Sequence, residues 1–366
     1  MDRQARHVGT PRPGGAAHLK RVMIVDDSLV ARTVLSRIVE AEADLEIVAK
    51  ATTGEMAIAR LSEAPVDVVL LDLEMPGMGG IGALPRILEL IGGGQVLVVS
   101  SLTEEGAEHT LRALSMGAAD TMLKPRAGEF DEGYARLLVG KIRALAARAG
   151  ATASPVAAPP VPVQRARGTD RPRALAIGAS TGGIHAMCLM LRALPRSFRL
   201  PILVAQHLPE SFMATLARQL ANASGRPALV ASAGMPIAPG HIYVAPGDGH
   251  LVVRRGGADL VTGIAHHAVP SGCTPSVDPL LESLADAAGG RAIGVILSGM
   301  GRDGFIGAEQ LVQAGGSVFA QDAATAAVWG MPRAVADAGL AAAVLPPDQI
   351  ALRVAALASP MEAQRA

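Results

Sequence analysis

Aromatic residues are scarce in this chain of 366 residues, which has five Phe, two Tyr and one Trp. Its cores must therefore be built from Ala, Val, Leu, Ile and Met, and because half of the residues are hydrophobic there is ample material to bury. Cysteine is nearly absent too: Cys188 lies in an apolar helical pattern and Cys273 in a predicted loop. Two cysteines form neither a disulfide framework nor a metal quartet, so we interpret both as structural or incidental.

The chain also lacks net charge and long apolar runs. Lys plus Arg and Asp plus Glu each total 33, which gives no indication of nucleic acid as an obligatory partner. No apolar run approaches the roughly 18 to 20 residues of a membrane-spanning helix. The polar start, which contains Gly and Pro, lacks the apolar core of a signal peptide. We therefore expect a cytoplasmic protein without direct membrane insertion.

The length predicts two domains. Residues 1–19 have the composition of a disordered N-terminal extension. In residues 20–143 short apolar runs alternate with helical patterns, which predicts a five-stranded doubly wound α/β domain. Residues 144–172 are rich in Pro and Ala and are typical of an extended linker. The alternation resumes in residues 173–357, which predicts a second α/β domain, and residues 358–366 form a short tail.

The second domain is predicted to contain a doubly wound parallel sheet with an antiparallel hairpin inserted into it. Two short apolar runs flank Gly247, Asp248 and Gly249. Because Asp-Gly is a common hairpin turn, we expect the hairpin to turn there.

Carboxylates follow two strands of the first domain. Asp26 and Asp27 come after the first predicted strand and Asp72 after the third, while Ser100 ends the fourth and Lys124 follows the fifth. Ligands of such sheets bind beyond the carboxyl ends of the strands, so these side chains should converge. Three carboxylates raise one another's pKa unless a cation lies between them, and Mg²⁺ prefers oxygen ligands.

Ser180 is the candidate nucleophile of the second domain. It lies in G-A-S-T-G, which fits the G-x-S-x-G elbow that exposes a serine at a strand-to-helix turn. A serine needs a base, and His207 ends the apolar run P-I-L-V-A-Q-H at the same predicted sheet edge. Asp303 follows another strand and Asp322 is its rival as the carboxylate that orients the histidine. Asp278 is interpreted as a helix cap.

Four motifs of the first domain resemble the receiver domain of response regulators: V-D-D-S at 25–28, L-D-L-E-M-P-G-M-G-G at 71–80, S-S at 100–101 and K-P at 124–125. The resemblance implies that Asp72 accepts a phosphoryl group. The other roles it implies are Mg²⁺ binding by Asp26, Asp27, Asp72 and the backbone carbonyl of Glu74, and phosphate contacts by Ser100 and Lys124.

Four motifs of the second domain, I-G-A-S-T-G-G, Q-H-L-P, P-S-V-D and S-G-M-G-R-D-G, resemble the catalytic domain of chemotaxis protein-glutamate methylesterases of the CheB type. The resemblance implies that Ser180 is the nucleophile, that His207 is the general base and acid, and that Asp303 orients the histidine. It also offers the backbone N–H of Met300 as an oxyanion donor and Thr181 as an active-site neighbour.

This resemblance carries a function with it. It implies hydrolysis of glutamate methyl esters on methyl-accepting chemoreceptors, with release of methanol, and deamidation of receptor glutamines, with no cofactor for ester hydrolysis. A chemotaxis-type histidine kinase would be the phosphodonor. The unphosphorylated receiver would cover the catalytic cleft.

Two alternatives remain open from the residues themselves. The glycine-rich segment 178–183 could be a phosphate loop of a nucleotide-binding or scaffolding domain, although it lacks the lysine of a P-loop and the G-x-G-x-x-G spacing. The second domain could also be a hydrolase for small-molecule esters or amides.

Overall fold

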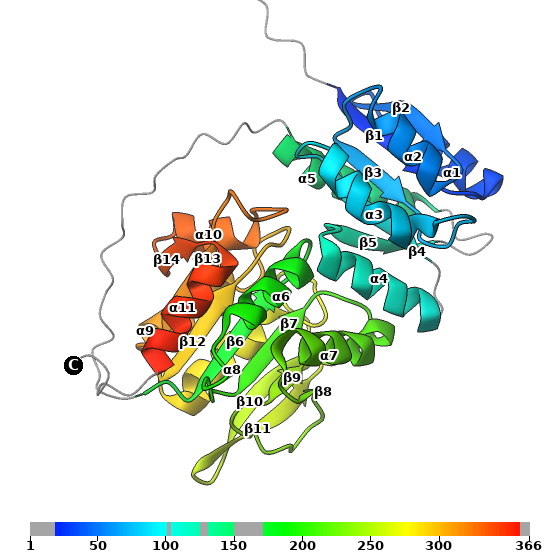
Figure 1. Cartoon of the computed structure of the whole chain (residues 1–366). Coiled ribbons are helices and arrows are strands. Elements are labelled where there is room, and N and C mark those ends of the chain that lie inside the picture. The colour runs from blue at the N-terminus through cyan, green and yellow to red at the C-terminus, as the bar shows by residue number, and fades with distance from the viewer. Residues whose placement is uncertain (1–18, 101–103, 125–130, 150–170, 359–366) are drawn as a thin grey trace, which may run out of the picture.

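We describe the protein from a computed structural model, which covers residues 19–100, 104–124, 131–149 and 171–358. The expected tails, 1–19 and 358–366, lie almost entirely outside this range, as does most of the expected linker. Two α/β domains follow one another along the chain (Figure 1). Of the helices that the structure describes, none is long and apolar enough to cross a membrane.

The N-terminal domain is a parallel sheet of five strands in the order β2-β1-β3-β4-β5. Its elements are β1 (Lys20–Val25), α1 (Leu29–Glu40), β2 (Leu45–Ala51), α2 (Gly54–Leu61), β3 (Val68–Leu71), α3 (Gly79–Leu90), β4 (Gln95–Ser100), α4 (Glu104–Met116), β5 (Asp120–Leu123) and α5 (Glu132–Ala149). The predicted five-stranded doubly wound sheet is confirmed.

Apolar residues explain why these segments form buried strands and covering helices. All four residues of β3 are buried, as expected for a strand with helices over both faces. Ser28 caps α1 by accepting a hydrogen bond from the Ala31 N–H. Helix α5 continues past the position at which the sequence predicts the linker, because Leu145 and Ala146 are buried in the core of this domain.

The C-terminal domain has a parallel sheet of seven strands in the order β14-β13-β12-β6-β7-β9-β8. Its elements are β6 (Ala174–Ala179), α6 (Gly183–Ala193), β7 (Ile202–Gln206), α7 (Glu210–Ser224), β8 (Ala228–Val230), β9 (Ile242–Val244), β10 (His250–Gly256), β11 (Asp259–Ala265), α8 (Val277–Ala288), β12 (Ala292–Ile296), α9 (Phe305–Gln313), β13 (Ser317–Gln321), α10 (Met331–Asp337), β14 (Ala341–Leu345) and α11 (Pro347–Ala358). From β6 the chain first runs outward to one side and later returns to β12 on the other. The switch point, where such sheets bind ligands, therefore lies between β6 and β12.

An antiparallel hairpin is present, but the predicted position of its turn is wrong. Strands β10 and β11 pair antiparallel, so the turn lies between Gly256 and Asp259, and the hairpin projects away from the N-terminal domain (Figure 1). The Gly247 region instead connects β9, a parallel strand of the main sheet, to β10. A Cβ on Gly247 would lie 2.2 Å from the Glu210 backbone, so close packing rather than turn geometry requires glycine there.

The two domains meet beside the β6–α6 turn. Helix α4 lies against α6 and α7 (Figure 1). The N–H of Gly182 donates to the Ala119 carbonyl at 2.5 Å, and Thr181 Oγ1 donates to Asp120 Oδ2 at 2.6 Å. His185 Nδ1 lies 3.0 Å from the Ser115 carbonyl oxygen. The N-terminal domain thus contacts the glycine-rich turn directly.

A second contact comes from the loop between β13 and α10. Its residues Ala327 and Val328 pack with Tyr134 against the core of the N-terminal domain. The next residue, Trp329, is the one tryptophan of the sequence. Its indole Nε1 donates to the Gln321 carbonyl at 2.9 Å, and its backbone pairs with Gly299. This loop therefore connects the N-terminal domain to the turn that follows β12.

Candidate functional site

Ser180 occupies a tightly held turn at the end of β6. Its N–H donates to the Ser298 carbonyl at 3.0 Å, and its own carbonyl accepts from Gln206 Nε2 at 3.0 Å. Gly182 caps α6 with φ of 77°, and a Cβ there would lie 2.4 Å from the Cβ of Ala327. Glycine is required by both conformation and space, and the turn keeps Ser180 at the sheet edge.

His207 lies beside this turn because β7 pairs with β6. Ala179 is in register with Gln206, so the next residues along the two strands are Ser180 and His207. The His207 N–H donates to the Ala179 carbonyl at 3.1 Å. No hydrogen bond in the described part of the chain joins Ser180 Oγ to His207, which is common in catalytic sites before substrate binds.

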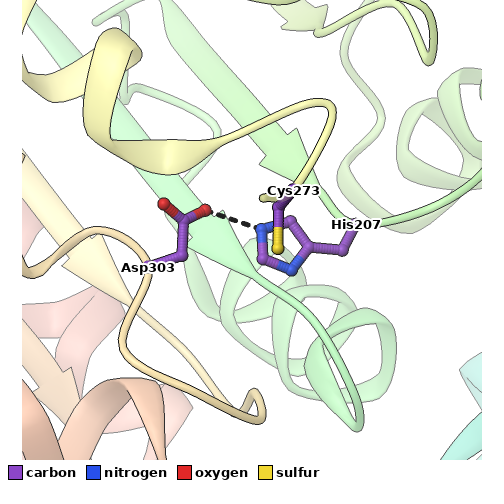
Figure 2. Close-up of side chains that lie close together, drawn as sticks. All are labelled: His207, Cys273 and Asp303. Atoms are coloured by element: carbon purple, nitrogen blue, oxygen red, sulfur yellow. Dashed lines mark hydrogen bonds and ion pairs between the residues drawn. The ribbon is translucent and has the colours of Figure 1, made fainter. Parts of the chain in front are cut away.

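Asp303 holds the His207 ring. Its Oδ2 lies 2.7 Å from His207 Nε2, as the dashed line in Figure 2 shows. An ionised carboxylate only accepts hydrogen bonds, so Nε2 carries a proton, and in the neutral imidazole the lone pair lies on Nδ1. Burial acts to lower the pKa of His207, but the hydrogen bond to Asp303 and the neighbouring Cys273 raise it to about 9. The structure thus joins two of the three predicted triad residues directly.

Asp303 is itself 2 % exposed and accepts hydrogen bonds from three donors. Besides His207, Ser276 Oγ donates to its Oδ1 at 2.6 Å and the Val277 N–H donates to its Oδ2 at 2.7 Å. Burial acts to raise the pKa of Asp303, but these donors hold it well below its usual range. The carboxylate is therefore ionised at neutral pH.

Sequence reasoning did not identify Ser276 or the histidine behind it. Buried His250 accepts a hydrogen bond on Nδ1 from the Ser276 N–H at 3.0 Å, so Nε2 carries its proton and donates to the His267 carbonyl at 2.9 Å. His250 thus fixes the position of Ser276 and, through it, of Asp303. The motif P-S-V-D contained a signal, because a serine directly before a helix is a typical N-cap, as Ser276 is for α8.

The structure also separates the other two candidate carboxylates from the histidine. Asp322 is a turn residue whose Oδ1 accepts from the Thr325 N–H at 3.0 Å. The prediction that Asp278 caps its helix is wrong: the cap of α8 is Ser276, and Asp278 accepts from the Gly307 N–H at 2.8 Å. Burial raises the pKa of Asp278.

Thr181 and the segment that leads into Met300 both adjoin Ser180. A Cβ on Gly299 would lie 2.9 Å from the Ser180 Cβ, so the backbone that leads into Met300 crosses directly beside the serine. The Met300 side chain is 41 % exposed. Thr181 is buried, and its hydroxyl is bonded across the domain interface to Asp120.

Cys273 is the unexpected member of this site. It projects from the loop between β11 and α8 and lies against the His207 ring (Figure 2). Its Sγ, a His207 ring nitrogen and an Asp303 carboxylate oxygen all lie within 4.8 Å of one another. The interpretation of Cys273 as incidental overlooked this contact, because a loop has no periodicity from which its path could be predicted.

The acidic cluster of the N-terminal domain forms as predicted at the strand ends. Carboxylate oxygens of Asp26, Asp27 and Asp72 lie within 4.8 Å of one another. Lys124 Nζ lies 2.7 Å from Asp72 Oδ2 and 3.0 Å from Asp26 Oδ2. Ser100 Oγ is buried at the same edge and has no hydrogen-bond partner among the described residues.

These residues fit a hard divalent cation. All three acidic side chains offer oxygen, the donor that Mg²⁺ prefers, and one ammonium neutralises only part of their charge. The Glu74 N–H donates to Asp72 Oδ1 at 3.2 Å, which brings the Glu74 backbone to the cluster. Burial raises the pKa of Asp72 to about 6; Lys124 opposes this shift and Asp26 adds to it. A cation here would relieve the cost of the buried charge.

The comparisons with known proteins agree with the geometry. Residues 22–131 match the response regulator receiver domain and residues 175–354 match the CheB methylesterase domain. The chain is 47 % identical to protein-glutamate methylesterase/protein-glutamine glutaminase 2 of Caulobacter vibrioides, over 92 % of this chain and 99 % of that one. It is 42 % identical to enzyme 1 of the same name from Paramagnetospirillum magneticum, over 95 % of this chain and 98 % of that protein. The crystal structure of the Thermotoga maritima CheB methylesterase catalytic domain aligns with a TM-score of 0.50 and 34 % identity, over 51 % of this chain and all of that one.

We expect Asp303→Asn to lower the pKa of His207 from about 9, because burial, which lowers this pKa, is then opposed by Cys273 alone. Histidine titration by NMR measures this directly, with Asp322→Asn as the control that leaves His207 unchanged. A raised histidine pKa stabilises the folded state below about 6.5, and this contribution is lost as pH rises through about 9. A His207 pKa that is unaffected by Asp303→Asn would contradict the pairing.

We expect Asp72→Asn to stabilise the N-terminal domain at neutral pH. The folded-state pKa of Asp72 is raised, so its charge costs stability increasingly as pH rises from 3.8 through about 6. Removing the charge should raise the free energy of unfolding by up to about 3 kcal/mol. Chemical denaturation at pH 7.5 measures this effect, and added Mg²⁺ should stabilise the unmodified protein more than the variant.

Asp67→Asn is the matched control for this measurement. Asp67 forms an ion pair with Arg21 at 2.7 Å away from the cluster, so its neutralisation should destabilise the same domain. If Asp72→Asn and Asp67→Asn changed the free energy of unfolding in the same direction, the inference that the buried charge of Asp72 costs stability would be contradicted.

Proposed function

We propose that this chain, which belongs to the CheB family of receiver-containing protein-glutamate methylesterases/protein-glutamine glutaminases, hydrolyses glutamate methyl esters on methyl-accepting chemoreceptors with Ser180 as nucleophile. The observation that carries the assignment is the bond between His207 and Asp303 next to the Ser180 turn. We place the reaction in the cytoplasm, in chemotaxis adaptation. The receiver comprises residues 20–149 and the catalytic domain residues 173–357.

In the first step, Ser180 Oγ attacks the carbonyl carbon of the glutamate side-chain ester. In its neutral form, His207 accepts the serine proton on Nδ1, because its Nε2 donates to Asp303. The ionised Asp303 stabilises the imidazolium that forms. The backbone N–H of Met300, which follows the segment that crosses beside Ser180, is the proposed donor to the developing oxyanion.

Collapse of the tetrahedral intermediate releases methanol, which takes its proton from His207, and leaves a glutamyl ester of Ser180. His207 then deprotonates a water molecule, which attacks this ester and frees the glutamate. Glutamine deamidation follows the same steps with ammonia as the leaving group. None of these steps needs a metal or an organic cofactor.

The receiver is proposed to restrain the catalytic domain when it is unphosphorylated. Ala119 and Asp120 accept hydrogen bonds from the two residues that follow Ser180, so the turn is in contact with the receiver. A substrate helix approaching Ser180 would have to displace this contact. Only contacts that exist in the closed state can favour closure.

Asp72 is the proposed acceptor of a phosphoryl group from a chemotaxis-type histidine kinase. Mg²⁺, held by Asp26, Asp27, Asp72 and the Glu74 carbonyl, would supply charge neutralisation for the phosphoryl oxygens. Ser100 and Lys124 would contact the phosphate. The buried Ser100 hydroxyl lacks a partner among the described residues, which suits this role.

We expect Ser180→Ala to lower the rate of methanol release from methylated receptor by at least about 10⁴-fold, because members of a triad act as a unit. His207→Ala should cost a comparable factor. Ser271→Ala, an exposed serine in the loop that carries Cys273, is the control and should retain the rate. Circular dichroism of all three variants should match the unmodified protein. Turnover by Ser180→Ala close to that of the control would exclude Ser180 as the nucleophile.

We expect Asp120→Ala to raise the rate without phosphodonor, because the variant loses the acceptor of the Thr181 hydroxyl. A hydrogen bond to a charged group contributes about 1.5–3 kcal/mol, so the increase should be about tenfold or more. Asp44→Ala, which breaks ion pairs with Lys20 and Arg143 away from the interface, should leave the rate unchanged. A basal rate that Asp120→Ala leaves unchanged would argue against restraint through this contact.

Asp72→Asn should abolish stimulation by a phosphodonor with Mg²⁺.

A further inference from the structure

The side chains of His207, Cys273 and Asp303 form a donor set of nitrogen, sulfur and oxygen. Their ligand atoms lie within 4.8 Å of one another, and they come from three separate segments: the end of β7, the loop before α8 and the loop after β12. Ester hydrolysis as derived above uses the histidine and the aspartate but gives the thiol no role. The presence of Cys273 against the ring therefore needs a separate account.

The chemistry of this trio differs from that of the receiver cluster. Asp26, Asp27 and Asp72 offer only hard oxygen donors, which suit Mg²⁺. Thiolate and imidazole are the donors that zinc prefers, and three protein ligands with one position left for water are a common zinc arrangement. The two trios should therefore select different metals within one chain.

We propose that His207, Cys273 and Asp303 form an inhibitory site for Zn²⁺ within the catalytic centre. Zinc would bind Cys273 Sγ, His207 Nε2 and a carboxylate oxygen of Asp303. The Cys273 thiol and the partly exposed His207 ring, whose side chain is 14 % accessible, provide the path by which the ion enters. Asp303 lies behind them and completes the site from the buried side.

Zinc binding at Nε2 explains why the site would inhibit. The metal takes the position of the proton that Nε2 shares with Asp303. The thiol proton leaves to solvent as the thiolate forms, and the imidazole stays neutral by carrying its single proton on Nδ1. Nδ1 then has no lone pair, so His207 is unable to deprotonate Ser180 or water.

The inhibitory effect rests on the proposed esterase function, whereas metal binding does not. Two readouts on the full-length protein separate the two. Co²⁺, used in place of zinc, reports a sulfur ligand by its thiolate charge-transfer absorption. Methanol release from methylated receptor, measured in a zinc buffer at micromolar free Zn²⁺, reports inhibition.

The key variant is Cys273→Ser, which removes the soft ligand and leaves the proposed catalytic residues in place. We expect it to lose the cobalt–thiolate band and, with inhibition measured relative to its own metal-free rate, to raise the zinc concentration for half-inhibition more than about tenfold, since even outer-shell partners of a metal are worth that much. The matched control is Cys188→Ala, which removes the other cysteine, buried in α6. It should keep both the band and the zinc sensitivity.

Each result has one meaning. A cobalt–thiolate band that survives in Cys273→Ser, or is absent from the unmodified protein, overturns the site. Zinc inhibition of equal strength in Cys273→Ser and the unmodified protein also overturns it, because the metal then acts elsewhere. If no chain releases methanol, the proposed esterase function fails, and the cobalt spectra still decide whether the trio binds metal.

Discussion

A single buried carboxylate organises the catalytic domain. Asp303 is removed from water, so its charge is tolerated only because three donors satisfy it. Those donors belong to the end of β7 and to the first residues of α8, and Asp303 itself belongs to the loop after β12. Loss of the charge would therefore weaken all of the hydrogen bonds that join these three segments. The imidazole tautomer, the cap of α8 and the path of the Met300 loop all depend on this one group.

Much of the architecture was predictable because parallel sheets impose strong rules. Buried strands read as apolar runs and their carboxyl ends meet at one edge, so the strand pattern places Ser180, His207 and the candidate carboxylates at that edge. The same rule brought Asp72 and its neighbours to the edge of the first sheet. Between Asp303 and Asp322 the pattern alone did not decide, since both follow strands of the same sheet. The hydrogen bond to His207 distinguishes them.

The features that were not predictable depend on contacts between loops. Gly247 looked like a hairpin turn, but its glycine serves a close approach to the Glu210 backbone, a long-range contact that no local pattern encodes. Ser276 and Cys273 reach the site from a loop, where neither the strand period of 2 nor the helix period of 3.6 predicts the path of the chain, and His250 reaches it from the first position of β10. The hydrogen bond from Thr181 to Asp120 of the receiver was equally unpredictable, because it joins residues 61 positions apart along the chain.

The scarcity of aromatic residues has an experimental consequence. All of the tryptophan fluorescence of this protein arises from one indole, that of Trp329. This residue sits between Gly299, in the loop that borders Ser180, and Val328, which packs against the receiver core. A change in the environment of Gly299 or of Val328 should therefore alter the fluorescence of this one indole. The native sequence thus already contains a single-site optical reporter at the junction of its two domains, and no label has to be introduced.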